Sequence, residues 1–306
     1  MAFGLVSSTA AAQLTVTAVP QIRVEAKLVQ ANCTATRGKL DEPTTLNTTE
    51  TEVLEDGHRQ SLVAVRRGDD LPLTLTLLLD LSGSTEQRWQ VLRSQSANFI
   101  RSAMRPGDRV AVLSFSDTIR VLADSDHEPS PRRLAELVEH MPVEEGMEVY
   151  KRPTGVHGTR MWDALRLATS ATPMEGRKAI LVLTDGVDSA SAVKPEEIVK
   201  GAQMVSVPVY AVLTPSPAWT DPPRLQRPGE GPHKLREAVE QTGGITFLGD
   251  DQSVSSRLDE FVQILRSQFI VEYTPAAKSI KPKAHRLLVR SSDPHVTVHC
   301  MGEVIH

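Results

Sequence analysis

Apolar and polar positions along the chain change their pattern twice. Residues 22–37 alternate apolar and polar side chains, which predicts a half-buried strand. Asp56-Gly57 separates two short strand-like runs between residues 51 and 63, and this dipeptide tolerates the positive φ angles of a tight hairpin turn. We therefore expect a small β unit before the main domain.

From residue 71 onward, apolar strand patterns alternate with helical ones. Alternating strands and helices bury each strand on both faces, which predicts an α/β fold with a doubly wound, mostly parallel sheet flanked by helices. A stretch rich in proline at residues 214–232 interrupts the order and is expected to be a surface loop. The expected strands are 71–80, 109–115, 119–122, 179–184, 207–213 and 245–248, and the expected helices are 89–104, 131–140, 160–170, 195–204, 234–241 and 255–266.

Strand patterns return near the end of the chain, at 268–275, 285–290 and 295–304. We expect them to pair with the N-terminal β unit, so that both chain ends form one small appended β subdomain. The expected organisation is a tail or signal-peptide remnant at 1–20, an N-terminal β segment at 21–69, the α/β domain at 70–266 and a C-terminal β segment at 267–306.

Composition excludes several classes of partner. The chain has 34 Lys and Arg against 38 Asp and Glu, a net charge of -4, and so lacks the basic field that nucleic-acid binding requires. No apolar run approaches the roughly 20 residues that span a bilayer, so no membrane span is expected. Residues 1–13 end in Ala-Ala-Ala-Gln, as signal-peptidase sites do, but lack the usual length and positive charge; a trimmed signal and a plain tail both remain open.

Two cysteines, Cys33 and Cys300, are too few for a disulfide-dense scaffold or a four-cysteine zinc site. Each falls on an expected strand of the appended β segments. A disulfide joining the two ends, which requires export from the cytoplasm, and a pair of buried thiols are both open.

Oxygen-bearing side chains gather where strands end or helices begin. Asp80, Ser82 and Ser84 follow the first strand of the α/β domain, Asp185 follows a later one, and Thr159 precedes a helix. Ligands of open α/β sheets bind at the carboxyl ends of strands. Oxygen donors favour a hard cation over Zn²⁺. The expected ion is Mg²⁺, and Mn²⁺ and Ca²⁺ are the alternatives. If the carboxylates act through water, the ion stays electron-deficient and attracts an outside anion.

The three segments that carry these side chains together resemble the metal-ion-dependent adhesion site of von Willebrand factor type A domains. The resemblance implies direct metal contacts from Ser82, Ser84 and Thr159, water-mediated roles for Asp80 and Asp185, and a remaining position filled by a carboxylate of the ligand. It covers about residues 70–265, and the flanks look like a bacterial subfamily of von Willebrand factor A-related proteins frequent in acidobacterial genomes.

Two neighbouring residues have competing interpretations. His157 departs from the glycine that the family often has before Gly158, and is either a pH-sensitive rim residue or a solvated loop histidine. Asp188 is interpreted as a helix-capping or solvated acid rather than a ligand.

The expected function is a non-catalytic, metal-dependent adhesion module, periplasmic or secreted, that captures an Asp or Glu of a protein partner. One alternative is a scaffold that recognises partners through the appended β subdomain, with a structural or lost metal site. Another is a hydrolase, because His157-Gly158-Thr159 is similar to a fragment of subtilisin-like proteases; no later Gly-Thr-Ser segment supplies a nucleophile. Trp219 in the proline-rich loop is a candidate partner contact. The other histidines, including His285 and His306, show no ligand spacing.

Overall fold

The computed structural model gives the fold of most of the chain. The expected tail or signal-peptide remnant at 1–20, His157 and Trp219 lie outside the described residues. Within the described part, no helix has both the length and the apolar character needed to cross a membrane. The described residues are 28–38, 42–140, 142, 146–150, 158–173, 176–215, 231–250, 252–276 and 283–306.

A mixed sheet forms the centre of the molecule, and the α/β prediction is confirmed. Among the described residues it has seven strands, of which six run in the same direction, and only the sixth in the order is antiparallel to its two neighbours. Their order is β12 (Thr246–Leu248), β11 (Val209–Leu213), β10 (Arg177–Thr184), β6 (Leu73–Asp80), β7 (Arg109–Phe115), β8 (Ile119–Asp124) and β9 (Met147–Tyr150).

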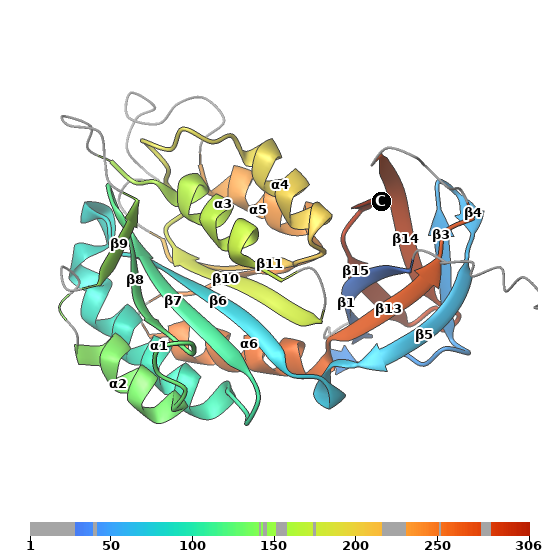
Figure 1. Ribbon diagram of the computed structural model, residues 1–306, viewed down its shortest axis with the longest axis horizontal. Helices are drawn as coiled ribbons and strands as arrows, with labels where there is room; N and C mark the ends of the chain where they lie inside the picture. Colours follow the sequence, from blue (N-terminus) through green and yellow to red (C-terminus); the bar gives the residue numbers. More distant parts are fainter. Residues whose placement is uncertain are drawn as a thin grey trace, which may run out of the picture.

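Helices cover both faces of this sheet (Figure 1). Alternating leucines of β6 divide between two cores: Leu75 and Leu77 pack with one set of helices, and Leu78 packs with the other. Burying each leucine fully contributes about 2 kcal/mol. The first set is α1 (Trp89–Ala103), α2 (Pro131–His140) and α6 (Val254–Ser267), and the second is α3 (Met161–Ala171), α4 (Pro195–Met204) and α5 (Pro232–Gln241).

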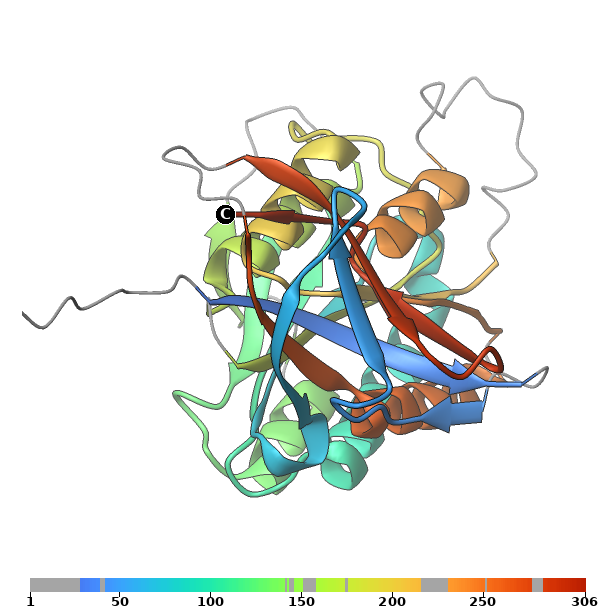
Figure 2. The same cartoon turned by 90° about the vertical axis from the view of Figure 1, so that its right-hand side faces the viewer.

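Strands from both chain ends form two further sheets that share one hydrophobic core beside the α/β domain (Figure 2). We call this pair of sheets the sandwich. One sheet contains β1 (Val29–Arg37), β2 (Glu42–Thr44), β5 (Ser61–Arg67), β13 (Phe269–Thr274) and β15 (Val296–Cys300); the other contains β3 (Thr51–Glu55), β4 (His58–Arg59), β14 (Ala284–Ser291) and β16 (Glu303–Ile305).

Two details of the sandwich test the sequence patterns. The expected Asp56-Gly57 hairpin is confirmed, since β3 pairs antiparallel with β4 and the two residues have φ of 50° and 81°. The prediction of a single strand over 295–304 is wrong. β15 pairs with β1, β16 pairs with β14 of the other sheet, and the chain changes sheets at the fully buried Met301.

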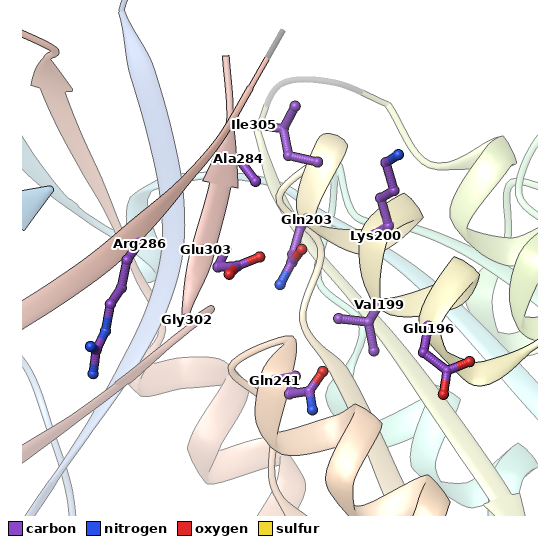
Figure 3. Close-up of a pocket in the computed structure, with 10 residues that line it drawn as sticks. All are labelled: Glu196, Val199, Lys200, Gln203, Gln241, Ala284, Arg286, Gly302, Glu303 and Ile305. Carbon is purple, nitrogen blue, oxygen red and sulfur yellow. The ribbon is translucent and has the colours of Figure 1, made fainter. Parts of the chain in front are cut away.

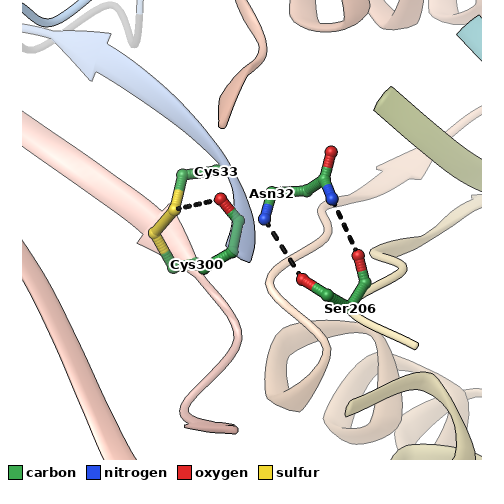
Figure 4. Close-up of a disulfide and its surroundings, with 5 residues drawn as sticks. Asn32, Cys33, Ser206 and Cys300 are labelled. Atoms are coloured by element: carbon green, nitrogen blue, oxygen red, sulfur yellow. Dashed lines mark hydrogen bonds between the residues drawn. A yellow bond between two sulfur atoms is a disulfide. The ribbon is translucent and has the colours of Figure 1, made fainter. Parts of the chain in front are cut away.

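A disulfide joins Cys33 of β1 to Cys300 of β15, which face each other across the two antiparallel strands (Figure 4). Their Cα atoms lie 4.5 Å apart although 267 residues separate them in sequence. Of the two states that the sequence leaves open, the structure has the disulfide.

The sandwich and the α/β domain are fastened together by polar contacts. Asn32 donates from its backbone to Ser206 Oγ at 3.3 Å and from Nδ2 to Ser206 O at 2.9 Å (Figure 4). Gly68 N donates to Gln268 O at 2.6 Å, and a Cβ at position 68 would lie only 2.2 Å from that oxygen. Only glycine therefore permits the close approach of the two segments that connect the sandwich to the domain.

Candidate metal centre

The carboxyl ends of β6 and β10 form the centre of the candidate site. These strands are adjacent and parallel, with Leu79 opposite Leu183. The residues that follow, Asp80 and Thr184, therefore lie side by side, and the Thr184 hydroxyl donates to Asp80 Oδ2 at 2.6 Å. Both side chains are fully buried. The sheet brings the Asp80 carboxylate next to the segment that contains Asp185, as the strand-end rule predicts.

The turn after β6 carries the two predicted serines. Ser82 N donates to Asp80 Oδ1 at 3.0 Å, and the hydroxyl oxygens of Ser82 and Ser84 lie 3.2 Å apart. The Thr85 hydroxyl donates to Asp80 O at 2.8 Å, and Trp89 Nε1 donates to Ser82 O at 3.2 Å. Ser82 is buried whereas Ser84 is exposed. The turn thus leads from a buried carboxylate to hydroxyls at the surface.

Asp185 is the second buried carboxylate of the site. Its Oδ1 accepts a hydrogen bond from Val187 N at 3.0 Å. Gly186 between them has φ of 77°, and a Cβ there would lie 3.0 Å from atoms of Leu213 and Pro232. Glycine is required at this turn for both reasons, and it lets the chain reverse directly after Asp185.

Burial and the charge of Asp185 both disfavour ionisation of Asp80. Burial, and after it the negative charge of Asp185, raises the pKa of Asp80 from 3.8 to about 7, although Ser82 and Thr184 donate hydrogen bonds to it. Such a pair is relieved either by taking up a proton or by binding a cation.

Thr159 is held at the start of α3 by the loop that follows β10. Its backbone N donates to Ser189 Oγ at 3.0 Å, and its carbonyl accepts from Ser189 N at 3.1 Å and Ala190 N at 3.0 Å. Gly158 before it has φ of 140°, and a Cβ there would lie 2.5 Å from Ser189 Oγ. Further along the same segment, Met161 Sδ lies 3.9 Å from the Thr184 hydroxyl that binds Asp80.

Two acidic residues, Asp188 and Asp163, hold this loop and the start of α3 together. Asp188, anticipated as a helix cap or a solvated acid, is buried and accepts hydrogen bonds from Trp162 N at 3.3 Å and the Ser191 hydroxyl at 2.6 Å. It therefore caps the first turn of α3, and burial raises its pKa. Asp163 was missed: its Oδ2 pairs with Arg160 at 2.8 Å, and its Oδ1 accepts from Ala192 and Val193 N. The only feature of the sequence that could have pointed to Asp163 was the presence of an acidic residue in the first turn of a predicted helix.

The predicted donor groups are chemically suited to a hard divalent cation. Hydroxyl oxygens at Ser82, Ser84 and Thr159 are neutral, whereas Asp80 and Asp185 supply negative charge from buried positions. Oxygen donors of this kind are those that Mg²⁺, Mn²⁺ and Ca²⁺ prefer. The residues present therefore fit such an ion.

The chain belongs to the von Willebrand factor type A domain family. The family profile matches residues 74–234, which is more than half of the chain and includes every predicted site residue. A search of curated protein sequences finds no match.

Several solved structures are similar in fold at low identity. One is proximal thread matrix protein 1 from the mussel byssus, with a zinc-occupied MIDAS (metal-ion-dependent adhesion site) motif. It is 16% identical with a TM-score of 0.47, and the likeness covers 68% of this chain. This chain spans about half, 48%, of that protein's length. BatB from Bacteroides thetaiotaomicron is 19% identical over 63% of this chain and 97% of its own (TM-score 0.46). A von Willebrand factor type A protein from Catenulispora acidiphila is 12% identical over 91% and 72% (TM-score 0.46). The family assignment rests on the sequence match alone.

Proposed function

We propose that this chain is a non-catalytic, divalent-cation-dependent protein-binding module of the adhesion type. Ser82, Ser84 and Thr159 would hold Mg²⁺, with Asp80 and Asp185 acting mainly through water. The cation would supply a positive centre that takes a carboxylate oxygen from an Asp or Glu of a protein partner. Mn²⁺ and Ca²⁺ have the same preference for oxygen and are the alternative ions.

One observation carries the proposal: two buried carboxylates lie beside a turn whose hydroxyls lead outward to the surface. Burying like charges together is costly unless a cation or a proton compensates them. Because Asp80 is fully buried and Ser84 is exposed, an ion at this turn would be held on its buried side and accessible to a partner on its solvent side.

The disulfide supports a location outside the cytoplasm, in the periplasm or secreted. Disulfides persist in oxidising compartments and are rare where thiols are kept reduced. Cys33 and Cys300 join strands from the two ends of the described chain.

A second candidate function is partner recognition by the sandwich, with the metal only ordering the loops. A pocket of about 550 Å³ lies between α4 and strands β14 and β16 (Figure 3). Glu196 and Lys200 line it from the domain, and Arg286 and Glu303 line it from the sandwich. Charges of both signs around one pocket favour a polar partner segment.

Metal binding is the first prediction. Asp80→Ala is expected to weaken Mg²⁺ binding by about 10- to 100-fold, because outer-sphere carboxylates tune affinity by that amount. Isothermal titration calorimetry of the chain after EDTA treatment and dialysis measures the change. Asp259→Ala, which removes an exposed carboxylate on α6, is the matched control and should bind as the wild type does. Equal Mg²⁺ affinity in the two variants would contradict the site.

Partner binding separates the two functions. Proteins captured by the immobilised chain in Mg²⁺ are compared with those captured in EDTA, and the affinity of an identified partner is then measured against Ser82→Ala. The adhesion proposal expects capture to be lost in EDTA and in Ser82→Ala. Binding that persists in EDTA supports recognition by the sandwich, and turnover of a partner that Ser82→Ala abolishes would indicate a hydrolase.

A further inference from the structure

A cluster of metal-ligating side chains lies in the sandwich, on a different part of the chain from the residues of the adhesion-type site. Glu55 ends β3, His285 is on β14, and His306 follows β16. These are three neighbouring strands of one sheet. Each residue is at least nine-tenths buried, with exposed fractions of 3% for Glu55 and 6% for both histidines.

The side chains of this cluster converge. One ligand atom from each residue lies within 4.8 Å of the other two. His306 Nε2 is 3.0 Å from Glu55 Oε2, and His285 Nδ1 is 3.7 Å from Glu55 Oε1. Glu55 Oε2 also accepts the Tyr273 hydroxyl at 2.7 Å. The Glu55 carboxylate is therefore oriented from the opposite sheet and faces both imidazoles.

His285 carries a second, independent signal. Its Nδ1 lies 2.9 Å from Asp56 Oδ2. Since a carboxylate only accepts, Nδ1 carries a proton, and in the neutral imidazole the lone pair then lies on Nε2. That Nε2 atom is buried and has no hydrogen-bond partner among the described residues. Metal-binding histidines characteristically donate their other ring N–H to a carboxylate, which leaves the remaining nitrogen for the ion.

We propose that Glu55, His285 and His306 form a zinc site in the sandwich. Two imidazole nitrogens and one carboxylate are a donor set that Zn²⁺ uses when it keeps a fourth position for water. This set differs from the all-oxygen set at the strand ends of the α/β domain, so the two sites should select different ions.

Zinc binding requires two small changes in the cluster. The ion takes the place of the proton between His306 Nε2 and Glu55 Oε2, and the imidazole proton passes to Nδ1 through solvent. The two rings lie stacked, with centroids 4.6 Å apart and planes 11° apart, so one ring must turn about its Cβ–Cγ bond to direct its lone pair at the ion. His306 also lines a pocket of about 250 Å³ beside the end of α4, which provides a route of entry.

The test measures Zn²⁺ binding by the full chain after EDTA treatment, with excess Mg²⁺ present to occupy the oxygen site. Wild type and Asp80→Ala are both expected to bind Zn²⁺ and to give the strong visible absorption of four-coordinate Co²⁺ when cobalt replaces zinc. Glu55→Gln and His306→Ala are expected to lose more than about 100-fold in Zn²⁺ affinity, beyond the loss typical of an outer-sphere change. Asp56→Asn should lose about 10- to 100-fold.

His295→Ala is the matched control, because His295 is exposed on the turn before β15 of the same sandwich. It should bind Zn²⁺ as the wild type does. Melting temperatures in EDTA and in Zn²⁺ separate folding from binding, since Zn²⁺ should raise the melting temperature of wild type and not of His306→Ala. Unchanged Zn²⁺ affinity in His306→Ala, or no Zn²⁺ binding by Asp80→Ala, would show that the cluster is only two stacked histidines hydrogen-bonded to carboxylates. Asp80→Ala lacks a residue of the adhesion-type site, so either proposal can fail alone.

Discussion

At the scale of single residues, Asp80 links the fold to the proposed cation. It ends a buried strand, accepts hydrogen bonds from Ser82 and Thr184, and is close enough to Asp185 for their charges to interact. Polar groups placed in this way do not stabilise the sheet that carries them. A buried carboxylate with a raised pKa opposes folding when it ionises, and a bound cation removes that opposition.

Asp80→Asn should therefore stabilise the metal-free protein. The folded state holds the Asp80 proton up to about pH 7, whereas the unfolded chain releases it near 3.8. The folded state thus binds more protons within that window, and stability falls as pH rises through it. Asn removes the effect, so the free energy of unfolding in EDTA at pH 8 should rise by about 2–4 kcal/mol.

Urea unfolding at pH 8 and at pH 4 measures this change. The gain should be present at pH 8 and nearly absent at pH 4. The exposed Asp259→Asn on α6 serves as the control and should change little at either pH. A loss of stability at pH 8 would show that the Asp80 hydrogen bonds outweigh its charge.

At the scale of elements, the most predictable parts were those with strong periodicity. The bounds of β7, α2 and α4 agree with the sequence pattern, because each has a buried face and a clear first residue. Strand β9 was missed because it lies at the edge of the sheet and exposes its apolar residues, Met147 by 56% and Val149 by 38%. Edge strands of this kind show no alternation between buried and exposed faces.

The start of α3 is the element that positions Thr159. Asp163 in its first turn binds Arg160 and two backbone groups of the loop after β10. The two backbone groups lie about 30 residues from Asp163 in sequence, so only the folded structure shows the connection. Helix and loop are held as one unit by the hydrogen bonds that the loop backbone donates to Asp163, whose carboxylate also pairs with Arg160 in a buried ion pair.

Asp163→Ala should destabilise this unit. Removing one partner of a buried ion pair typically costs about 3–5 kcal/mol, and two backbone N–H groups lose their acceptor as well. The free energy of unfolding from urea titration should fall by at least about 3 kcal/mol, with Asp259→Ala as the exposed comparison. Mg²⁺ affinity should fall too, because Thr159 loses its fixed position. A change below about 0.5 kcal/mol, as at ordinary surface sites, would contradict this role.

At the scale of the whole molecule, the sequence motifs point to the adhesion-type site and not to the histidine cluster. Asp80, Ser82 and Ser84 are close in sequence at the end of one strand, so the sequence alone shows their spacing. Glu55 and His306 are 251 residues apart and meet only because β3, β14 and β16 pair. Long-range strand pairing in a sandwich leaves no local spacing, which is why the histidines showed no ligand pattern.

The disulfide should contribute strongly to global stability. It closes a loop of 267 residues, and the loss of chain entropy on that scale corresponds to about 5–6 kcal/mol in the unfolded state. Replacing Cys33 and Cys300 together by serine should lower the free energy of unfolding by about 2–5 kcal/mol. Dithiothreitol should produce a similar loss in the wild type and none in the double variant. Equal urea midpoints with and without reductant in the wild type would refute this expectation.

The same bond also governs how the molecule carries mechanical load. Because β1 and β15 are linked covalently, tension applied at the two chain ends passes from Cys33 directly to Cys300. The intervening chain, with the whole central sheet and the turn after β6, lies inside the closed loop and does not bear this tension. A tethered module of this design would keep the proposed binding surface folded under forces that stretch the segments outside the disulfide.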